Sequence, residues 1–188
     1  MPYTVIYDAC VLYPAPLRDI LIELAASGLF RAKWTERIHD EWIRNLLANR
    51  DDLDEAKLRT TAARMDAAVL DALVRDYDAL IPALTLPDPD DRHIMAAAIK
   101  INADAIVTFN KKDFPDSALS PYGIEVQHPD DFIHNQFGLD QAKVVASANA
   151  CRTRLKNPTF TGEEYLDTLL RQGLPQSVAA LKPFWKII

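Results

Sequence analysis

Short apolar runs alternate with amphipathic stretches over the first two thirds of the chain. The apolar runs predict strands at 3–8, 30–34, 104–109 and 124–127, and the run DALIPAL at 78–84 can hold another. Apolar residues at helical spacing predict helices at 14–30, 35–48, 54–74 and 89–101. This alternation of strands and helices predicts an α/β fold with three layers and a mainly parallel central sheet.

The pattern changes after His128, where helical spacing alone continues. Four helices are expected there, at 129–137, 140–155, 161–173 and 175–185. Four short helices bury only a small core by themselves. We therefore expect an α/β domain at 1–128 and an α-helical C-terminal extension at 129–188 that packs on it.

Charge and composition narrow the class of protein. The 188 residues carry a formal net charge of −6, which argues against a wholly basic nucleic-acid binder. Residues 129–188 contain 6 acidic and 7 basic side chains, so the acidic surplus lies in the first domain. No apolar run approaches the ~20 residues of a membrane span, and the N-terminus lacks the pattern of a signal peptide. Two cysteines are too few for a disulfide framework, and we expect a cytoplasmic protein.

Four acidic residues are expected to meet at one edge of the sheet. Asp8 directly follows the first predicted strand, and α/β folds place their sites beyond the carboxyl ends of such strands. Asp91 heads the apolar stripe of the helix at 89–101, whereas Arg92, His93 and Lys100 lie on the other side.

The other two acids come from a helix and a loop. Glu41 borders a buried stripe of the helix at 35–48, one turn from Asn45. Asp113 follows the strand that ends at Thr108, whose hydroxyl can reach a carboxylate.

Each acid also has an ordinary structural interpretation. Asp8 and Asp113 suit turns or caps, and Glu41 suits the surface of an amphipathic helix. In the segment LPDPDDRHIMAAAI, Asp88 suits an N-cap with Pro89 in the first turn, and Asp91 then falls at the capping-box position. Asp91 fits this account less well, because a carboxylate that points toward the sheet needs a partner, and a cation is the usual one. No His/Cys cluster accompanies the acids, so their hard oxygens favour Mg²⁺ or Mn²⁺ and phosphoryl chemistry.

Four segments in this order and spacing resemble the PIN-domain ribonucleases: VIYDACVLYP, HDEWIRNL, DPDDRHIMAAAI and AIVTFNKKDFP. The closest subset is the VapC-type toxins of toxin–antitoxin pairs that carry a helical C-terminal extension. The resemblance implies a PIN-like nuclease domain with an acidic pocket for Mg²⁺ or Mn²⁺. It also implies endonucleolytic cleavage of RNA and inhibition by a cognate antitoxin.

The resemblance assigns roles to individual residues. Asp8, Glu41 and Asp91 match the first three acids of the family, and Thr108 matches its Thr or Ser after the fourth strand. The fourth acid often stands two residues after that Thr, where this chain has Asn110, so Asp113 is the alternative. Whether one or two metal ions bind stays open. Cys10 replaces an Asn or Ser of many members and changes hydrogen bonds around Asp8.

Further expectations concern substrate and partners. Basic side chains flank the acids and either hold RNA phosphates or are ordinary solvated charge; they are Arg37, Arg44, Arg92, Lys111 and Lys112. A homodimer is a further expectation. The alternative function is a non-catalytic PIN-like module that binds or regulates a protein. No glycine-rich nucleotide motif occurs in the sequence.

Overall fold

The computed structural model describes residues 2–188 and divides into two compact units. Unit 1 combines the chain up to Tyr13 with Phe30–His128, and unit 2 combines Pro14–Leu29 with Pro129–Ile188. The chain passes from unit 1 to unit 2 after His128. Residues 14–29, which the sequence placed in the first domain, group instead with the C-terminal helices.

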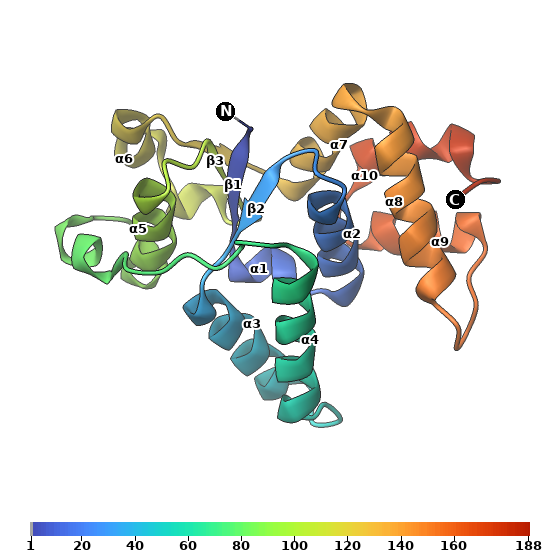
Figure 1. Cartoon of the computed structure of the whole chain (residues 1–188), viewed down its shortest axis with the longest axis horizontal. Coiled ribbons are helices and arrows are strands. Elements are labelled where there is room, and N and C mark those ends of the chain that lie inside the picture. Colours follow the sequence, from blue (N-terminus) through green and yellow to red (C-terminus); the bar gives the residue numbers. More distant parts are fainter. Residues whose placement is uncertain (1) are drawn as a thin grey trace. The chain divides into compact units, whose positions relative to one another are not determined.

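A four-stranded sheet forms the centre of unit 1 (Figure 1). Its strands are β1 (Thr4–Tyr7), β2 (Arg31–Lys33), β3 (Ala105–Val107) and β4 (Glu125–Gln127). They pair in the order β2-β1-β3-β4, and all three pairings are parallel. Val5, Ile6 and Tyr7 are fully buried, as expected for a central strand. The predicted α/β fold with a parallel sheet is confirmed.

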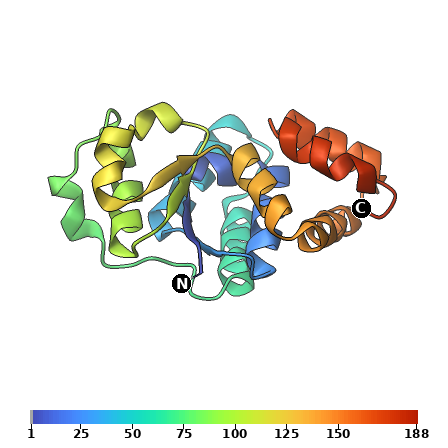
Figure 2. The ribbon, with the colours of Figure 1, turned by 90° about the horizontal axis from the view of Figure 1, so that it is seen from above.

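Helices flank this sheet. The α-helices of unit 1 are α1 (Ala9–Leu12), α3 (Glu36–Asn49), α4 (Glu55–Ala68), α5 (Arg92–Lys100) and α6 (Asp116–Leu119). Four 3₁₀ turns join them: η1 (Asp78–Ala83), η2 (Pro89–Asp91), η3 (Lys111–Asp113) and η4 (Ser120–Tyr122). Helix α5 packs on β1 and β3, while α3 contacts both α1 and α4. Figure 2 shows the same sheet from above.

Two predicted elements of unit 1 are wrong. The run at 78–84 forms η1 rather than a strand, and Pro82 within it has no N–H to give to a sheet. The helix expected to reach residue 74 ends at Ala68. The following backbone bonds to Trp34 instead: the Trp34 amide donates to the Ala72 carbonyl at 3.0 Å, and the Val74 amide donates to the Trp34 carbonyl at 2.8 Å.

A buried aromatic network fixes α3 against α4. The indole of Trp34 and Nε2 of His39 both donate to Oδ1 of Asp66, at 2.8 and 3.0 Å. The indole of Trp42 donates to Nδ1 of His39 at 3.0 Å. His39 therefore carries its proton on Nε2, since Nδ1 accepts a hydrogen bond. This network holds the helix that carries Glu41.

The regular secondary structure of unit 2 consists of helices. It contains α2 (Ala15–Ala26), α7 (Pro129–Leu139), α8 (Gln141–Arg154), α9 (Gly162–Arg171), α10 (Pro175–Leu181) and the 3₁₀ turn η5 (Lys182–Phe184). The four helices expected after His128 are confirmed. Helix α2 packs against α8 and α9, and α9 lies beside α10 (Figure 2). Thr161 and Glu164 form the capping box at the start of α9. Across residues 2–188, none of the helices has the length and apolar character needed to cross a bilayer.

Gly162 gives a test of packing in unit 2. A Cβ at this position would lie 1.9 Å from the carbonyl oxygen of Trp185, so Gly162→Ala must displace the backbone at one end of the contact. We expect the free energy of unfolding to fall by about 1–3 kcal/mol. Gly138→Ala is the matched control, because its Cβ would meet nothing within 4 Å in α7 and alanine favours helix. Thermal unfolding followed by circular dichroism should show a lower melting temperature for the first variant alone; equal melting temperatures would contradict this packing.

Candidate functional site

Asp8 lies at the carboxyl edge of the sheet, directly after β1. The residue is 5% exposed, and its backbone amide donates to the carbonyl of Val107 in β3. The carboxylate caps α1 by accepting from the backbone amide of Cys10 at 3.4 Å. The hydroxyl of Thr108 donates to Asp8 Oδ2 at 2.6 Å. The first predicted acid and the predicted threonine are therefore in direct contact.

Cys10 and Thr108 complete a hydrogen-bonded network around Asp8. The thiol of Cys10 lies 3.0 Å from Asp8 Oδ2 and 3.3 Å from the Thr108 hydroxyl. Burial, followed by the charge of Asp8, raises the pKa of the Cys10 thiol, so it stays protonated and can donate. The backbone amide of Asn110 donates to the Thr108 hydroxyl at 2.9 Å. The network fixes one oxygen of Asp8 and links it to the loop after β3.

Asp91 occupies the N-cap position of α5, but its side chain makes no capping hydrogen bond. The side chain of Asp88 does accept from the backbone amide of Asp90 at 2.8 Å, as expected for an N-cap. Asp91 ends η2 and precedes α5 without a capping hydrogen bond to that helix. It is half-buried, and the capping-box interpretation of Asp91 has no support in the structure.

Several carboxylates surround Asp91. Burial raises the pKa of Asp91 to about 7, and the second contribution is repulsion from nearby carboxylates, namely Asp8, Asp88, Asp113 and Glu41. Three of these four are the acids that the sequence proposed for the same site. Since charge effects of this kind act over short distances, the structure brings Asp8, Glu41, Asp91 and Asp113 into one electrostatic cluster.

Glu41 reaches this cluster from α3. Its side chain is 18% exposed and lies between two cationic or polar groups. Nε of Arg37 is 3.6 Å from Glu41 Oε1, and Nε2 of His93 is 2.9 Å from the same oxygen. His93 was expected on the outer side of its helix, but it is 1% exposed. Glu41 covers it, so the polar face of α5 is buried at this point.

The loop after β3 contributes Asp113 and Asn110 in different ways. Asp113 is half-buried in η3, and its charge contributes to the raised pKa of Asp91. Asn110 is exposed, and it bonds to Thr108 through its backbone amide. The carbonyl of Asn110 accepts from the amide of Asp113 at 2.9 Å, which curls the loop back toward the strand end.

The donor chemistry of the acids fits a hard divalent cation. Among residues 2–188, no three His, Cys, Asp or Glu side chains stand in positions ready to hold a metal ion together. The acids nevertheless supply several carboxylate oxygens in a region where their charges repel one another, and a cation relieves that repulsion. Mg²⁺ keeps several waters and needs only one or two protein carboxylates, so a complete ligand cage is not required.

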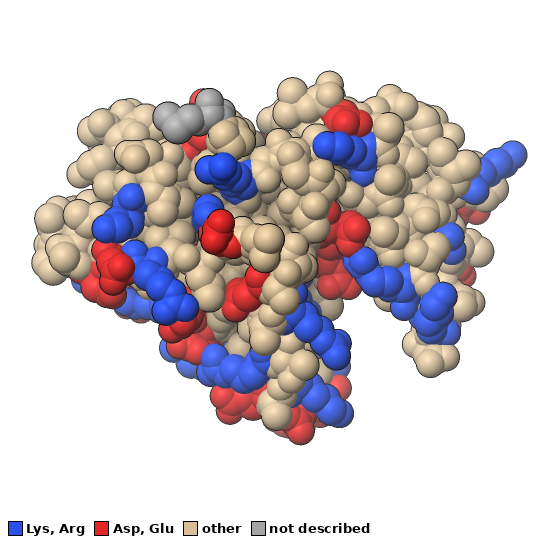
Figure 3. All heavy atoms as spheres, in the orientation of Figure 1, with Lys and Arg blue, Asp and Glu red and all other residues tan. Residues whose placement is uncertain are grey.

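Polar and basic residues around the acids remain accessible. Arg44 and Asn45 are exposed on α3, and Lys111 and Lys112 are exposed in η3. Arg92 is half-buried, and its Nε donates to the carbonyl of Pro89 at 2.8 Å. Figure 3 shows basic and acidic side chains interspersed over the face in view.

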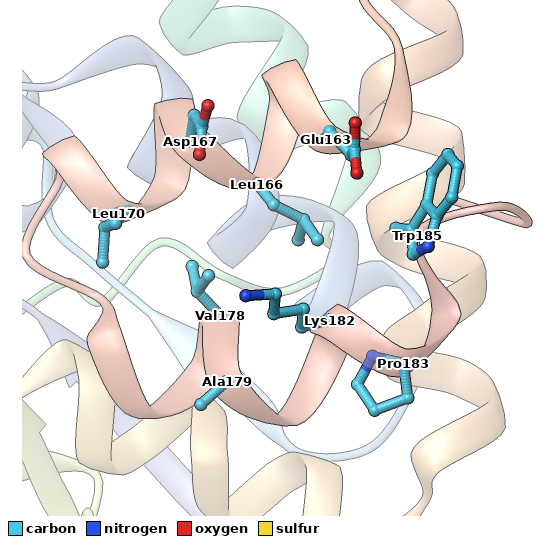
Figure 4. Close-up of a pocket in the computed structure, with 9 residues that line it drawn as sticks. All are labelled: Glu163, Leu166, Asp167, Leu170, Val178, Ala179, Lys182, Pro183 and Trp185. Carbon is cyan, nitrogen blue, oxygen red and sulfur yellow. The ribbon is translucent and has the colours of Figure 1, made fainter.

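A separate groove lies within unit 2, between α9 and the segment α10–η5 (Figure 4). Its volume is about 700 Å³, and Leu166 and Val178 point into it, with Lys182 across from the acids of α9. The groove is lined by none of the residues proposed for the acidic site. Its size alone therefore does not connect it with the carboxylate cluster.

Comparisons with known proteins agree with this arrangement. Residues 4–112 match the family model described as PIN domain. The chain belongs to the PIN domain family. Beyond the PIN domain, residues 129–183 match a second model, described as VapC50 C-terminal domain. The predicted resemblance to VapC-type PIN proteins with a helical extension is confirmed by these matches.

One curated relative also matches the PIN-domain chain. It is named "Putative ribonuclease VapC50" and comes from Mycobacterium tuberculosis (strain ATCC 25618 / H37Rv). The two are 43% identical over 89 residues, which cover 47% of this chain and 52% of the relative. The chain thus spans about half the length of that relative in the match. No solved structure matches the chain.

Sequence patterns alone did not identify His93 as a neighbour of the acids. Helical periodicity placed it opposite the stripe of α5 that faces the sheet, and that position usually meets solvent. Six consecutive residues, His93–Ala98, are in fact buried, because η1 and α3 supply cover on the remaining sides of this short helix. Helical spacing gave no signal for this contact, because residues i and i+2 lie on opposite sides of a helix.

The raised pKa of Asp91 predicts how the metal-free protein responds to pH. An unfolded aspartate ionises at about pH 4, whereas folded Asp91 ionises at about pH 7. The folded state therefore binds the additional proton between these values, and the free energy of unfolding falls as pH rises through this window. Asp91→Asn should remove that fall. Because Asp91 retains solvent contact, we expect a gain of about 1 kcal/mol at pH 8, or roughly 2–4 °C in melting temperature.

Chemical denaturation of metal-free protein at pH 4.5 and at pH 8 measures this difference. The exposed neighbour Asp90 supplies the control, since Asp90→Asn should change stability by less than about 0.5 kcal/mol at either pH. A variant Asp91→Asn that is less stable than the wild type at pH 8 would contradict the raised pKa of Asp91.

Proposed function

We propose that this PIN-domain protein is a metal-dependent endoribonuclease and the toxin component of a type II toxin–antitoxin system. The observation that carries the proposal is the cluster of four carboxylates, from four separate segments, at the carboxyl edge of a PIN-domain sheet. The name of the relative from Mycobacterium tuberculosis supports ribonuclease activity. RNA is the proposed substrate, and Mg²⁺ or Mn²⁺ is the proposed cofactor.

Asp8, Glu41, Asp91 and Asp113 would hold the cation. Such a cation, when bound, offsets charge that develops on the phosphate and lowers the pKa of the attacking water. Thr108 holds Asp8 in place through its 2.6 Å hydrogen bond, so this carboxylate needs little rearrangement to act.

The accessible basic residues suit the substrate. Arg44, Lys111 and Lys112 are exposed on the two segments that also carry Glu41 and Asp113. Phosphate contacts of this kind position a nucleic acid without reading its bases. Arg92 and Asn45 offer further donors next to the acids.

The helical extension and the partners belong to the same proposal. We expect residues 129–188 to pack on the PIN domain, and we expect a cognate antitoxin to inhibit the enzyme. The match of residues 129–183 to the VapC50 C-terminal domain supports this architecture. A homodimer and a cytoplasmic location complete the proposal.

Substitution of Asp8 tests the catalytic proposal. Asp8→Asn keeps an oxygen that can accept from Cys10, so the fold should survive while a charge is lost from the cluster. We expect cleavage of a single-stranded RNA in Mn²⁺ to fall by at least about 100-fold, and EDTA should abolish cleavage by the wild type. Asp90→Asn should cleave at the wild-type rate. Cleavage that survives EDTA or Asp8→Asn would favour a non-catalytic, protein-binding PIN module and a contaminating nuclease.

The loop after β3 offers a second test. Asp113 carries a full charge near Asp91, whereas Asn110 contributes a neutral side chain. Asp113→Asn should weaken Mn²⁺ binding and cleavage together, by roughly 10-fold or more. Asn110→Ala should reduce cleavage with a smaller effect on Mn²⁺ affinity. Calorimetric titration of Mn²⁺ into both variants decides whether Asp113 or Asn110 is the ligand. The reverse order of affinities would make Asn110 the ligand and Asp113 a turn residue.

A further inference from the structure

His93 is a buried polar side chain in contact with the acidic cluster. The residue is 1% exposed, and its Nε2 lies 2.9 Å from Oε1 of Glu41. The ring N–H is not aligned closely enough for a directed hydrogen bond, so the contact is electrostatic. Within the described chain, Nδ1 has no hydrogen-bond partner. Burial of an imidazole with a single polar contact is unfavourable, so its presence calls for an explanation.

The Glu41 side chain depends more than that of Asp8 on a neighbouring residue to fix its conformation. A glutamate has three rotatable side-chain bonds, and fixing them costs conformational entropy. Asp8, by comparison, is already fixed by Thr108 and by the backbone of α1. The Arg37 contact to Glu41 is longer, at 3.6 Å, and Arg37 has a side-chain exposure of 47%, so it contributes little.

His93 has the rigidity that Arg37 lacks. It stands in a run of six buried residues of α5, and α5 packs on β1 and β3. Asp91 lies two residues before His93, at the start of the same helix. A single buried helix therefore supplies one acid of the cluster directly and contacts the carboxylate of a second.

We propose that His93 is a positioning residue, which holds the Glu41 carboxylate beside Asp91 so that one divalent cation meets both acids. This inference rests on the proposed function. The role requires a proton on Nε2, which lies 2.9 Å from Glu41 Oε1. Both the charged ring and the neutral Nε2–H tautomer supply that proton, so the role does not depend on the titration of His93. Preorganisation of Glu41 lowers the entropy that cation binding must otherwise remove.

Mn²⁺ binding to the full chain, measured by calorimetry, tests this role without reliance on activity. His93→Leu fills the buried site with a side chain that has no N–H, and we expect the Mn²⁺ dissociation constant to rise by about 10-fold or more. His93→Gln retains an amide donor and should stay within about 3-fold of the wild type. Arg37→Met removes the exposed contact and should change the dissociation constant by less than about 2-fold.

A double-mutant cycle separates positioning from general stability. In a Glu41→Gln background, His93→Leu should cause no further loss of Mn²⁺ affinity, because the carboxylate that it positions is absent. An equal loss in both backgrounds, or an unchanged affinity in His93→Leu, overturns the inference even if the wild type binds Mn²⁺ and cleaves RNA. A wild type that binds no Mn²⁺ overturns both the inference and the proposed function. If His93→Leu fails to fold, His93→Asn, which shortens the amide, replaces it in the same cycle.

Discussion

The burial of Asp91 beside other carboxylates is the physical constraint on which the acidic site of unit 1 depends. Asp91 ionises at about pH 7 because it is partly buried and because four other acids lie near it. Such an arrangement is unfavourable in a metal-free protein, so the rest of the fold must hold the acids in place. A parallel sheet does this well, since the carboxyl ends of its strands meet at one edge and its core is fully buried.

The acids are held by different means, and this difference matters for chemistry. Asp8 is fixed by backbone and hydroxyl hydrogen bonds, with Thr108 and Cys10 on either side. Asp91 is fixed by its place between η2 and α5. Glu41 extends from α3, and that helix is itself locked to α4 through His39 and Asp66. The position of Glu41 therefore depends on its direct contact with His93 and, through α3, on the hydrogen bond between His39 and Asp66.

Unit 2 is a helical body that takes one helix from early in the chain. Helix α2 packs on α8 and α9, although more than a hundred residues separate α2 from α8. Glu23 of α2 and Arg154 of α8 form an ion pair at 2.6 Å. A close backbone contact also helps to pack unit 2, because Gly162 has no Cβ and leaves room for the carbonyl of Trp185. The family match at 129–183 describes most of this unit but not α2.

Much of the PIN fold could be predicted from local sequence. The buried strand before Asp8, the Thr35 and Thr161 caps and the helices after His128 all follow from short patterns of apolar and capping residues. The closeness of Asp8 to the loop after β3 was also predictable, because both follow parallel strands whose carboxyl ends share an edge. The roles of the four acids toward a metal ion remain a prediction.

Other features were decided only by tertiary structure. The backbone of residues 72–74 bonds to Trp34 instead of continuing α4, because a distant strand end offers it a donor and an acceptor. His93 is buried, because Glu41 from another helix covers a face that periodicity assigns to solvent. Residues 14–29 join the C-terminal helices, because their apolar side finds its partners there. In each case, the sequence by itself determined the local preference, and contacts between distant segments decided which partner satisfied it.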